Sequence, residues 1–192
     1  MVKADKQESI IRAALELIAE QGFHNAPMSS ISERAGVGTG TIYRYFENKD
    51  VLIAELYRDV EGRITPFLLD GYNTDQTIRH RFLHLGTVLL RYFVANPIDF
   101  RYLEQFHNSP YGVEFRRETL LGNKEKCDVY QDLFTDAIKL QAVKDLPLAS
   151  LYALAFGPLV SVARDHILGF SLLDESLISQ IIEASWDGIK SQ

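Results

Sequence analysis

Hydroxyl, aromatic and cationic side chains gather in one short segment of the chain, from Pro27 to Leu52. Hydroxyl groups and cations bind phosphate oxygens and the edges of bases, and Gly40 allows a backbone to approach closely. Two lysines near the N-terminus add positive charge. These are the residue types of a nucleic-acid contact. The candidates are Lys3, Lys6, Ser29, Ser30, Thr39, Gly40, Thr41, Tyr43, Arg44, Tyr45 and Lys49.

The spacing of apolar residues predicts that two short helices carry most of these side chains. Ile31 and Ala35 lie one helical turn apart, and Ile42 and Phe46 repeat that spacing after a turn at Gly36. A glycine at such a place commonly ends a helix in a left-handed conformation. Both apolar pairs therefore face one small core, with the polar residues outside it. This is the pattern of a helix-turn-helix, which places a helix in the major groove of DNA.

The same segment extends into a longer motif, A-G-V-x-x-G-T-x-Y-x-Y-F-x-x-K-x-x-L, from Ala35 to Leu52. This motif resembles the DNA-binding signature of the TetR family of bacterial repressors, and the apolar helix before Gly22–Phe23 is also similar to that family. Pro27 and Gly38 stand where the family commonly has hydroxyl residues. The resemblance implies a dimeric, all-helical regulator that binds double-stranded operator DNA and a small-molecule effector.

The charge of the chain limits how it can bind DNA. It has 20 Lys and Arg against 26 Asp and Glu, a net charge of −6. Residues 1–50 hold six Lys and Arg and seven Asp and Glu, which leaves 6 − 7 = −1. Binding through a strongly basic domain is thereby excluded. We expect a few well-placed cations and two half-sites of DNA, one for each subunit of a dimer.

The length of 192 residues suits a small three-helix module followed by one larger helical domain. We expect a helix-turn-helix DNA-binding domain over residues 1–48 and a ligand-binding and dimerisation domain over residues 49–192. The N-terminal residues lack the apolar stretch of a secretory signal, and the single cysteine, Cys127, excludes an internal disulfide framework. These features favour a cytoplasmic protein.

Apolar residues at helical spacing occur through almost the whole chain, without the alternation typical of strands. We therefore expect an all-α fold of about nine helices. Ser30 and Glu33 have the spacing of a capping box, so a helix is expected to begin at Ser30 or one turn earlier. Pro66 is expected to disturb the helix that opens at Asp50, and a long helix of about 25 residues is expected to end at Leu140.

The segment from Leu146 to Ala163 carries no formal charge over 18 residues, which is the lower limit for a membrane span. Pro147 and Pro158 and the absence of a flanking cluster of cations argue against a span. A helix that is apolar on most sides is also expected between its own core and a partner subunit. We expect this segment and the last helix to form half of a four-helix bundle across a two-fold axis. The expected interface residues are Leu151, Leu154, Pro158, Val162, Ile178, Ile181, Ile182 and Trp186.

Aromatic residues are dense between Tyr92 and Phe156. Any one of them is more often part of a core than of a binding site. The family resemblance nevertheless implies an effector site in this region, apolar with a few polar groups. Its polar candidates also include Gln105 and Asp132; if Glu104 or Asp132 lines it, a cationic aromatic ligand fits, and an apolar or acyl ligand fits equally well. The candidate ligand-binding residues are His84, Tyr92, Phe100, Leu103, Glu104, His107, Phe115, Tyr130, Phe134, Tyr152 and Phe156.

The sequence gives little support for a metal site or for an enzymatic activity. His80 and His84 are four residues apart, a spacing that can present two imidazoles to a metal, but no third ligand is adjacent in sequence. Arg79 and Arg81 beside them indicate a solvated basic face instead. The chain has no phosphate-binding glycine loop and no nucleophile elbow. We therefore expect no metal, no cofactor and no enzymatic activity.

These patterns leave three functions. The favoured one is a ligand-responsive transcriptional regulator, a repressor that binds palindromic operator DNA as a homodimer and is released by an aromatic or apolar effector. The second is an architectural or cell-cycle factor that binds DNA on the same fold without an effector. The third is a helical enzyme or carrier in which the helix-turn-helix pattern is incidental.

Overall fold

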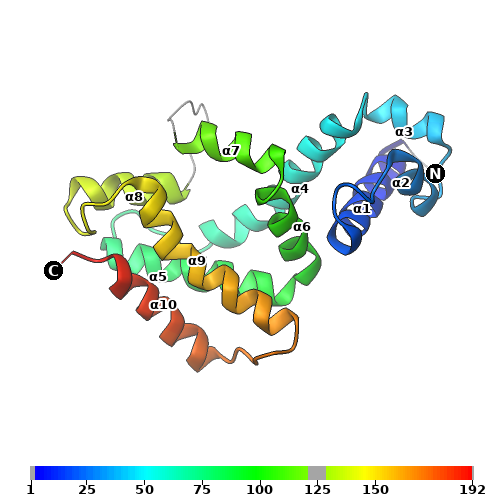
Figure 1. Cartoon of the computed structure of the whole chain (residues 1–192). Coiled ribbons are helices and arrows are strands. Elements are labelled where there is room, and N and C mark those ends of the chain that lie inside the picture. Colours follow the sequence, from blue (N-terminus) through cyan, green and yellow to red (C-terminus); the bar gives the residue numbers. More distant parts are fainter. Residues whose placement is uncertain (1–2, 121–128, 192) are drawn as a thin grey trace. The chain divides into compact units, whose positions relative to one another are not determined.

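The computed structural model describes residues 3–120 and 129–191, and the described residues form ten α-helices and no strand (Figure 1). The expectation of an all-α fold with about nine helices is confirmed. The helices are α1 (Lys3–Gln21), α2 (Met28–Arg34), α3 (Thr39–Tyr45), α4 (Lys49–Leu69), α5 (Ile78–Ala95), α6 (Pro97–His107), α7 (Pro110–Leu120), α8 (Val129–Lys139), α9 (Leu148–Ile167) and α10 (Glu175–Ile189).

The helices belong to two compact units. The first comprises Met1–Arg63 and Asn96–Phe115, and the second comprises Ile64–Ala95 and Arg116–Gln192. Both α4 and α7 therefore contribute residues to each unit. Neither unit ends at the predicted boundary between residues 48 and 49, because α6 packs against α1. That boundary, as a division of functions, stays a prediction.

In the first unit, α1 packs against both α2 and α6. The apolar stripe of α1 is buried, as its spacing of three and four residues requires, and Gly22 ends the helix at φ +77°. Buried Tyr102 of α6 donates a hydrogen bond to the carbonyl oxygen of Ile53 in α4, 3.2 Å away. The buried carboxylate of Asp99 accepts two hydrogen bonds from Arg63, at 2.8 and 3.2 Å. These contacts fix α6 against α4.

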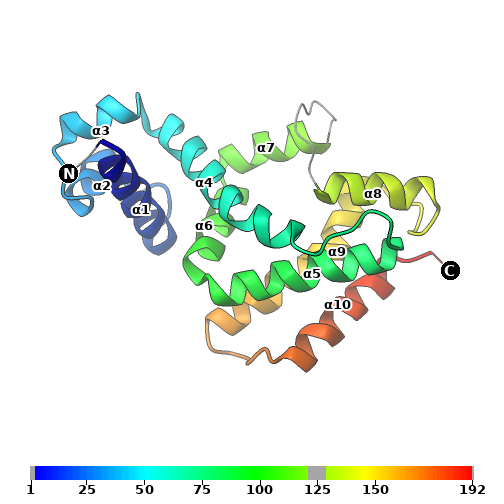
Figure 2. The ribbon, with the colours of Figure 1, turned by 180° about the vertical axis from the view of Figure 1, so that it is seen from behind.

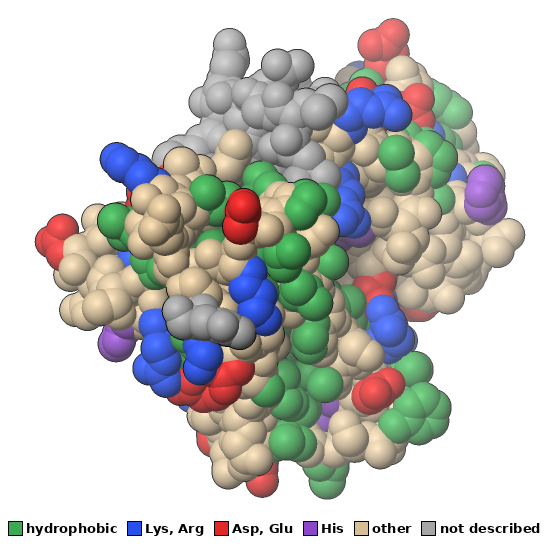
Figure 3. Space-filling model, turned by 60° about the vertical axis from the view of Figure 1, so that its left-hand side comes forward, with side chains coloured by type: hydrophobic (Ala, Val, Ile, Leu, Met, Phe, Trp, Pro, Cys, Tyr) green, Lys and Arg blue, Asp and Glu red, His purple; other side chains and the backbone are tan. Residues whose placement is uncertain are grey.

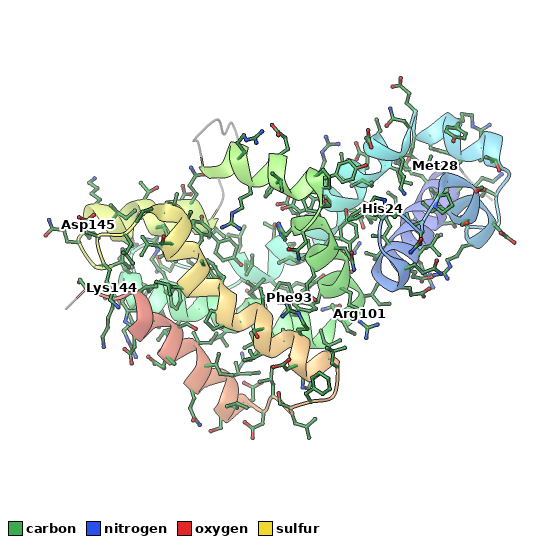
Figure 4. The ribbon with its side chains drawn as sticks, viewed as in Figure 1. His24, Met28, Phe93, Arg101, Lys144 and Asp145 are labelled. Atoms are coloured by element: carbon green, nitrogen blue, oxygen red, sulfur yellow. The ribbon has the colours of Figure 1, made fainter. Side chains whose placement is uncertain are left out.

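In the second unit, α5, α9 and α10 pack side by side, and α8 packs against α5 (Figure 2). A Cβ at Gly86 of α5 would lie 3.2 Å from side-chain carbons of Ile182 in α10, so a glycine permits close packing there. The connection between α8 and α9, in which Figure 4 labels Lys144 and Asp145, contacts the end of α10. Lys144 donates from its backbone to Ile189 and from its ammonium to Gly188.

Several helix boundaries differ from their predictions for local reasons. The capping box does not form, because Ser30 lies inside α2. The helix begins at Met28 after the N-cap residue Pro27, about one turn before Ser30 as the alternative start predicted, and Pro27 makes no side-chain hydrogen bond. Pro66 was expected to disturb α4, but the helix continues to Leu69, because a proline in the final turn affects little of the hydrogen-bond ladder. Residues 121–128, with Cys127 and part of the predicted long helix, lie outside the described residues.

Arg81 does not belong to a solvated basic face. Only 3% of its surface is exposed, whereas Arg79 is exposed and pairs with Glu183 of α10. Arg81 donates to Asp136 of α8 at 2.8 Å and to the Tyr72 hydroxyl at 2.9 Å. A charge can be buried when such partners compensate it, so Arg81 joins α5 to α8 and to the connection before α5.

The uncharged segment from Leu146 to Ala163 includes most of α9, and one face of this helix packs in the core of the second unit. Leu151, Ala155, Leu159 and Ala163 are fully buried at helical spacing in the second unit. Among the described residues, no helix is long and apolar enough to cross a membrane.

Substitution of Gly112 by alanine tests the close packing between α6 and α7. A Cβ there would lie 2.1 Å from the Phe106 carbonyl oxygen and 2.5 Å from the His107 Cα, so backbone must move. We expect Gly112→Ala to lower the free energy of unfolding by about 3 kcal/mol or more. Gly62→Ala is the matched control, since nothing lies within 4 Å of its Cβ position inside α4. It should stabilise by up to about 1 kcal/mol, and equal urea midpoints for the two variants would contradict the packing.

Candidate nucleic-acid interface

A small apolar core orients α2 and α3. Ile31, Ile42 and Phe46 are almost fully buried, as their spacing predicts, whereas Ala35 and Val37 are half-buried. Gly36 adopts φ +66° after α2, and the turn closes with a 2.9 Å hydrogen bond from the Val37 amide to the Ser32 carbonyl. Because the core uses one side of α3, the opposite side faces solvent.

The exposed side of α3 carries most of the candidate DNA contacts. Thr39, Gly40 and Arg44 are exposed, and Tyr43 is 51% exposed although it is a large aromatic residue. The Arg44 guanidinium carbon lies 5.4 Å from the centre of the half-buried Tyr45 ring, within the range of a cation–π contact. Aromatic hydroxyl and cationic groups are thus presented together on one short helix.

A buried hydroxyl that the spacing did not predict joins α2 to α3. Ser32 is 3% exposed, and its Oγ lies 2.8 Å from the carbonyl oxygen of Ser29 and 3.3 Å from Oγ1 of Thr39. Ser32 was missed because it is a serine on the buried face of a helix, where apolar residues are the usual signal. It fixes the first residue of α3 against α2.

Two hydrogen bonds with distant residues hold the first turn of α4. The Lys49 ammonium donates to the carbonyl oxygen of Phe23, in the connection where Figure 4 labels His24 and, at its end, Met28. Burial lowers the pKa of Lys49 from its ordinary value, and the charge of Asp50 partly opposes this effect. Tyr111 donates to the Asp50 carboxylate at 2.6 Å, and burial together with this bond raises the pKa of Tyr111 to about 12. Lys49 therefore has a structural contact in addition to its predicted role.

The other candidate DNA contacts lie on α1, α2 and α3. Ser29 is exposed and Ser30 half-buried in the first turn of α2, Thr41 is half-buried on α3, and Lys6 is half-buried on α1. The side chain of Lys3 lies outside the described residues. A groove of about 420 Å³ between α1 and α2 is lined by Glu8, Arg12, Glu16 and Arg34 among others, and Arg34 pairs with Glu20 at 2.8 Å. Its charges nearly balance, so it adds no basic surface.

The candidate ligand-binding residues fall into two groups, one in each unit. In the second unit, Tyr130 and Phe134 of α8 contact Tyr152 and Phe156 of α9, with ring centres 4.9 Å apart for Tyr130–Phe156 and 4.8 Å apart for Phe134–Tyr152. Phe134 is buried, and the other three are half-buried. These four residues form an aromatic cluster between two helices.

Two further candidates of the second unit have local partners. The His84 ring lies 3.1 Å from the carbonyl oxygen of Leu68 and 5.9 Å from the Tyr72 ring. Tyr92 is buried, with its ring centre 5.5 Å from Phe67. Among the described residues, no group of three His, Cys, Asp or Glu side chains could hold a metal ion.

The remaining ligand candidates belong to the first unit. Phe100 and Leu103 are buried in its core, and Glu104 is half-buried. His107 and Phe115 surround the stacked pair of Tyr57 and Phe106, whose ring centres are 4.2 Å apart. Tyr57 was not a candidate, because it lies on α4 outside the aromatic-rich segment.

The predicted interface residues divide between the two faces of α9 and α10. Four of them are buried in the core of their own unit: Leu151, Ile178, Ile182 and Trp186. Leu154 and Pro158 are exposed on α9, and Val162 and Ile181 are half-buried. Figure 3 shows apolar side chains gathered in a band on one face of the molecule. The exposed and half-buried members keep surface that a partner could cover.

Comparison with known proteins identifies the family. Residues 10–56 match the bacterial regulatory proteins of the tetR family, and residues 78–190 match the tetracyclin repressor-like C-terminal domain. A fatty acid metabolism regulator protein of Bacillus subtilis is 26% identical over 94% of this chain and 86% of its own length. A TetR-family regulator structure from Vibrio parahaemolyticus is 30% identical, with a TM-score of 0.76 over 97% of this chain and 99% of that one.

A further structure, of a TetR-family regulator from Marinobacter aquaeolei, has a TM-score of 0.83 over 98% of this chain and 97% of that one, at 20% identity. Such regulators are DNA-binding proteins rather than enzymes. Since the C-terminal match alone spans more than half of the residues, this chain belongs to the TetR family of transcriptional regulators, which bind DNA through a helix-turn-helix.

Proposed function

We propose that this regulator is a repressor that binds a palindromic operator as a homodimer and leaves it when a small effector binds. The observation that carries the proposal is the exposed polar side of α3, held over the buried residues Ile31, Ile42 and Phe46. A helix that is fixed on one side and polar on the other can enter the major groove without disturbing its core. Tyr43 and Arg44 then meet base edges and phosphates.

A dimer supplies the affinity for DNA that a single DNA-binding module lacks. Residues 1–50 have a charge of −1, so a single module gains little from non-specific attraction to phosphate. Two modules joined through their second units bind two half-sites about one helical turn of DNA apart. The symmetric interface uses the outer faces of α9 and α10, where Leu154, Pro158 and Leu177 are exposed.

The aromatic cluster of Tyr130, Phe134, Tyr152 and Phe156 is the proposed effector site. Three of these rings are only half-buried, which leaves apolar surface for a ligand. Asp132 is exposed, so a buried carboxylate for a cationic ligand has no support in this cluster. The Bacillus subtilis relative is named a fatty acid metabolism regulator protein, which favours an apolar or acyl effector.

Effector control requires different affinities in two states. A ligand that releases DNA must bind the state without DNA more tightly, and the loss of DNA affinity equals that difference.

Substitutions in the DNA-binding module distinguish residues that contact DNA from residues that stabilise the module. Tyr43→Ala should weaken operator binding at least about tenfold and change stability by less than about 0.5 kcal/mol, because Tyr43 is exposed. Lys49→Ala should weaken binding and also lower stability by about 1–3 kcal/mol, because the Phe23 carbonyl loses its donor. Fluorescence anisotropy and urea unfolding measure the two effects. Lys139→Ala, at an exposed lysine of α8, is the control, and normal binding by both variants would place the DNA contact elsewhere.

A charge on the outer face of α9 tests the dimer. Leu154→Glu should convert the dimer to a monomer in sedimentation velocity and weaken operator binding at least about tenfold, because a desolvated carboxylate would face the partner. Leu140→Glu places the same charge at a residue that is 66% exposed near the end of α8 and should leave the dimer intact. A dimeric Leu154→Glu variant would show that subunits meet elsewhere.

Saturation with an acyl ligand tests the effector site. Laurate below its micellar concentration, at 100 times its Kd, should stabilise the protein by about 2.7 kcal/mol and release the operator. Phe156→Ala should reduce this stabilisation, whereas Phe170→Ala, at a ring that is 78% exposed, should not. Dodecylamine, its cationic counterpart, should act more weakly. If no acyl compound changes both the unfolding midpoint and DNA binding, the architectural factor without an effector becomes the better account.

A further inference from the structure

The hydrogen bonds around Ser32 determine which way the hydroxyl protons point. The Ser32 hydroxyl has one proton and lies 2.8 Å from the carbonyl oxygen of Ser29. A carbonyl oxygen can only accept a hydrogen bond, so Ser32 donates its proton to Ser29. Toward Thr39, whose Oγ1 is 3.3 Å away, Ser32 can then only accept. Thr39 must therefore be the donor in that contact.

This direction has a consequence for the outer side of Thr39. Its hydroxyl also has a single proton, which is used on Ser32, and Ser32 is 3% exposed and fixed inside the module. The oxygen of exposed Thr39 keeps lone pairs that face away from the core. It can accept a hydrogen bond from an incoming group, but it cannot donate one while the contact with Ser32 lasts.

A side chain that can only accept a hydrogen bond distinguishes the donor groups of DNA from its acceptor groups. Phosphate oxygens carry no proton, so they gain nothing from Thr39. In the major groove, the donors are the exocyclic amino groups, N6 of adenine and N4 of cytosine. The other polar atoms there, N7 of adenine, N7 and O6 of guanine and O4 of thymine, are acceptors and would be repelled.

We propose that Thr39 selects the operator sequence by accepting a hydrogen bond from an exocyclic amino group, and that buried Ser32 imposes this preference by taking the Thr39 proton. The inference rests on the proposed entry of α3 into the major groove. It assigns Thr39 a base contact and Ser32 a positioning role that acts through Thr39.

The test removes the amino group from the DNA. Operator sequences are first selected from a random duplex pool with the full-length wild-type protein. Each adenine of a half-site is then replaced in turn by purine, and each cytosine by 2-pyrimidinone, which lack the amino group. At one position the wild-type affinity should fall about five- to tenfold, the effect of one hydrogen bond, and the analogue identifies adenine or cytosine.

Protein variants assign that loss to Thr39. Thr39→Val keeps the shape and the methyl group but has no acceptor, so it should bind the normal and the amino-free duplex within twofold of each other. Thr135→Val, at an exposed threonine of α8, should keep the full wild-type ratio. This comparison cancels any effect of the analogue on the duplex itself.

Ser32→Ala tests the positioning role. It frees the Thr39 proton, so that Thr39 can also donate a hydrogen bond. Exchange of the identified base for one with an oxygen in the amino position, guanine for adenine or thymine for cytosine, should then reduce the affinity of Ser32→Ala by less than half of the fold-loss seen with the wild type. Urea unfolding of the same variant gives its folded fraction, and a ratio taken on the folded protein does not respond to a loss of stability alone. An equal fold-loss for this exchange in Ser32→Ala and in the wild type would overturn the role of Ser32.

The other outcomes are equally decisive. If Thr39→Val loses as much affinity as the wild type at every amino-free position, Thr39 is not the acceptor, although operator binding stands. If the wild-type protein selects no sequence at all, the proposed operator binding fails and this inference fails with it.

Discussion

The DNA-binding surface depends on one constraint: α3 has seven residues and cannot form a stable helix alone. Its position comes from burial of Ile42 and Phe46 against α2, and from the buried Ser32 hydroxyl that contacts Thr39. The residues that we propose to face DNA are thus the ones that this small core leaves outside. Apart from Thr39 and Lys49, which belong to both, the supporting side chains and the proposed DNA contacts are separate sets, so DNA specificity can change on the exposed side without loss of the fold.

The DNA-binding module has few cations, and some of them bind other residues of the module. Lys49 donates to the Phe23 carbonyl, and Arg34 pairs with Glu20, so two cations of the module have internal partners. Non-specific attraction to DNA is correspondingly small in our account, and hydrogen bonds from α3 and the pairing of two modules must supply the affinity. Effector control fits this arrangement, because weak single-module binding makes release sensitive to small changes between states.

Local spacing was sufficient for most of the fold, since the helices and the core of the helix-turn-helix follow from apolar residues three and four apart. Spacing did not predict burial where contacts with residues far away in the sequence determine it. Arg81 is buried because Tyr72 and Asp136 meet it, and neither is adjacent in sequence. On α9, spacing found two apolar faces without showing that Leu151 meets its own core and Leu154 faces outward. The aromatic ligand candidates fall into two different units for the same reason. Those on α6 lie in the first unit, because α6 packs against α1.

The central claim, that α3 occupies the major groove, is tested most directly by methylation of a bound operator with dimethyl sulfate. This reagent methylates guanine N7 in the major groove and adenine N3 in the minor groove. Our account predicts protection of guanine N7 in two patches about one helical turn apart, with adenine N3 still reactive within both patches. Protection of adenine N3 with fully reactive guanine N7 would contradict it.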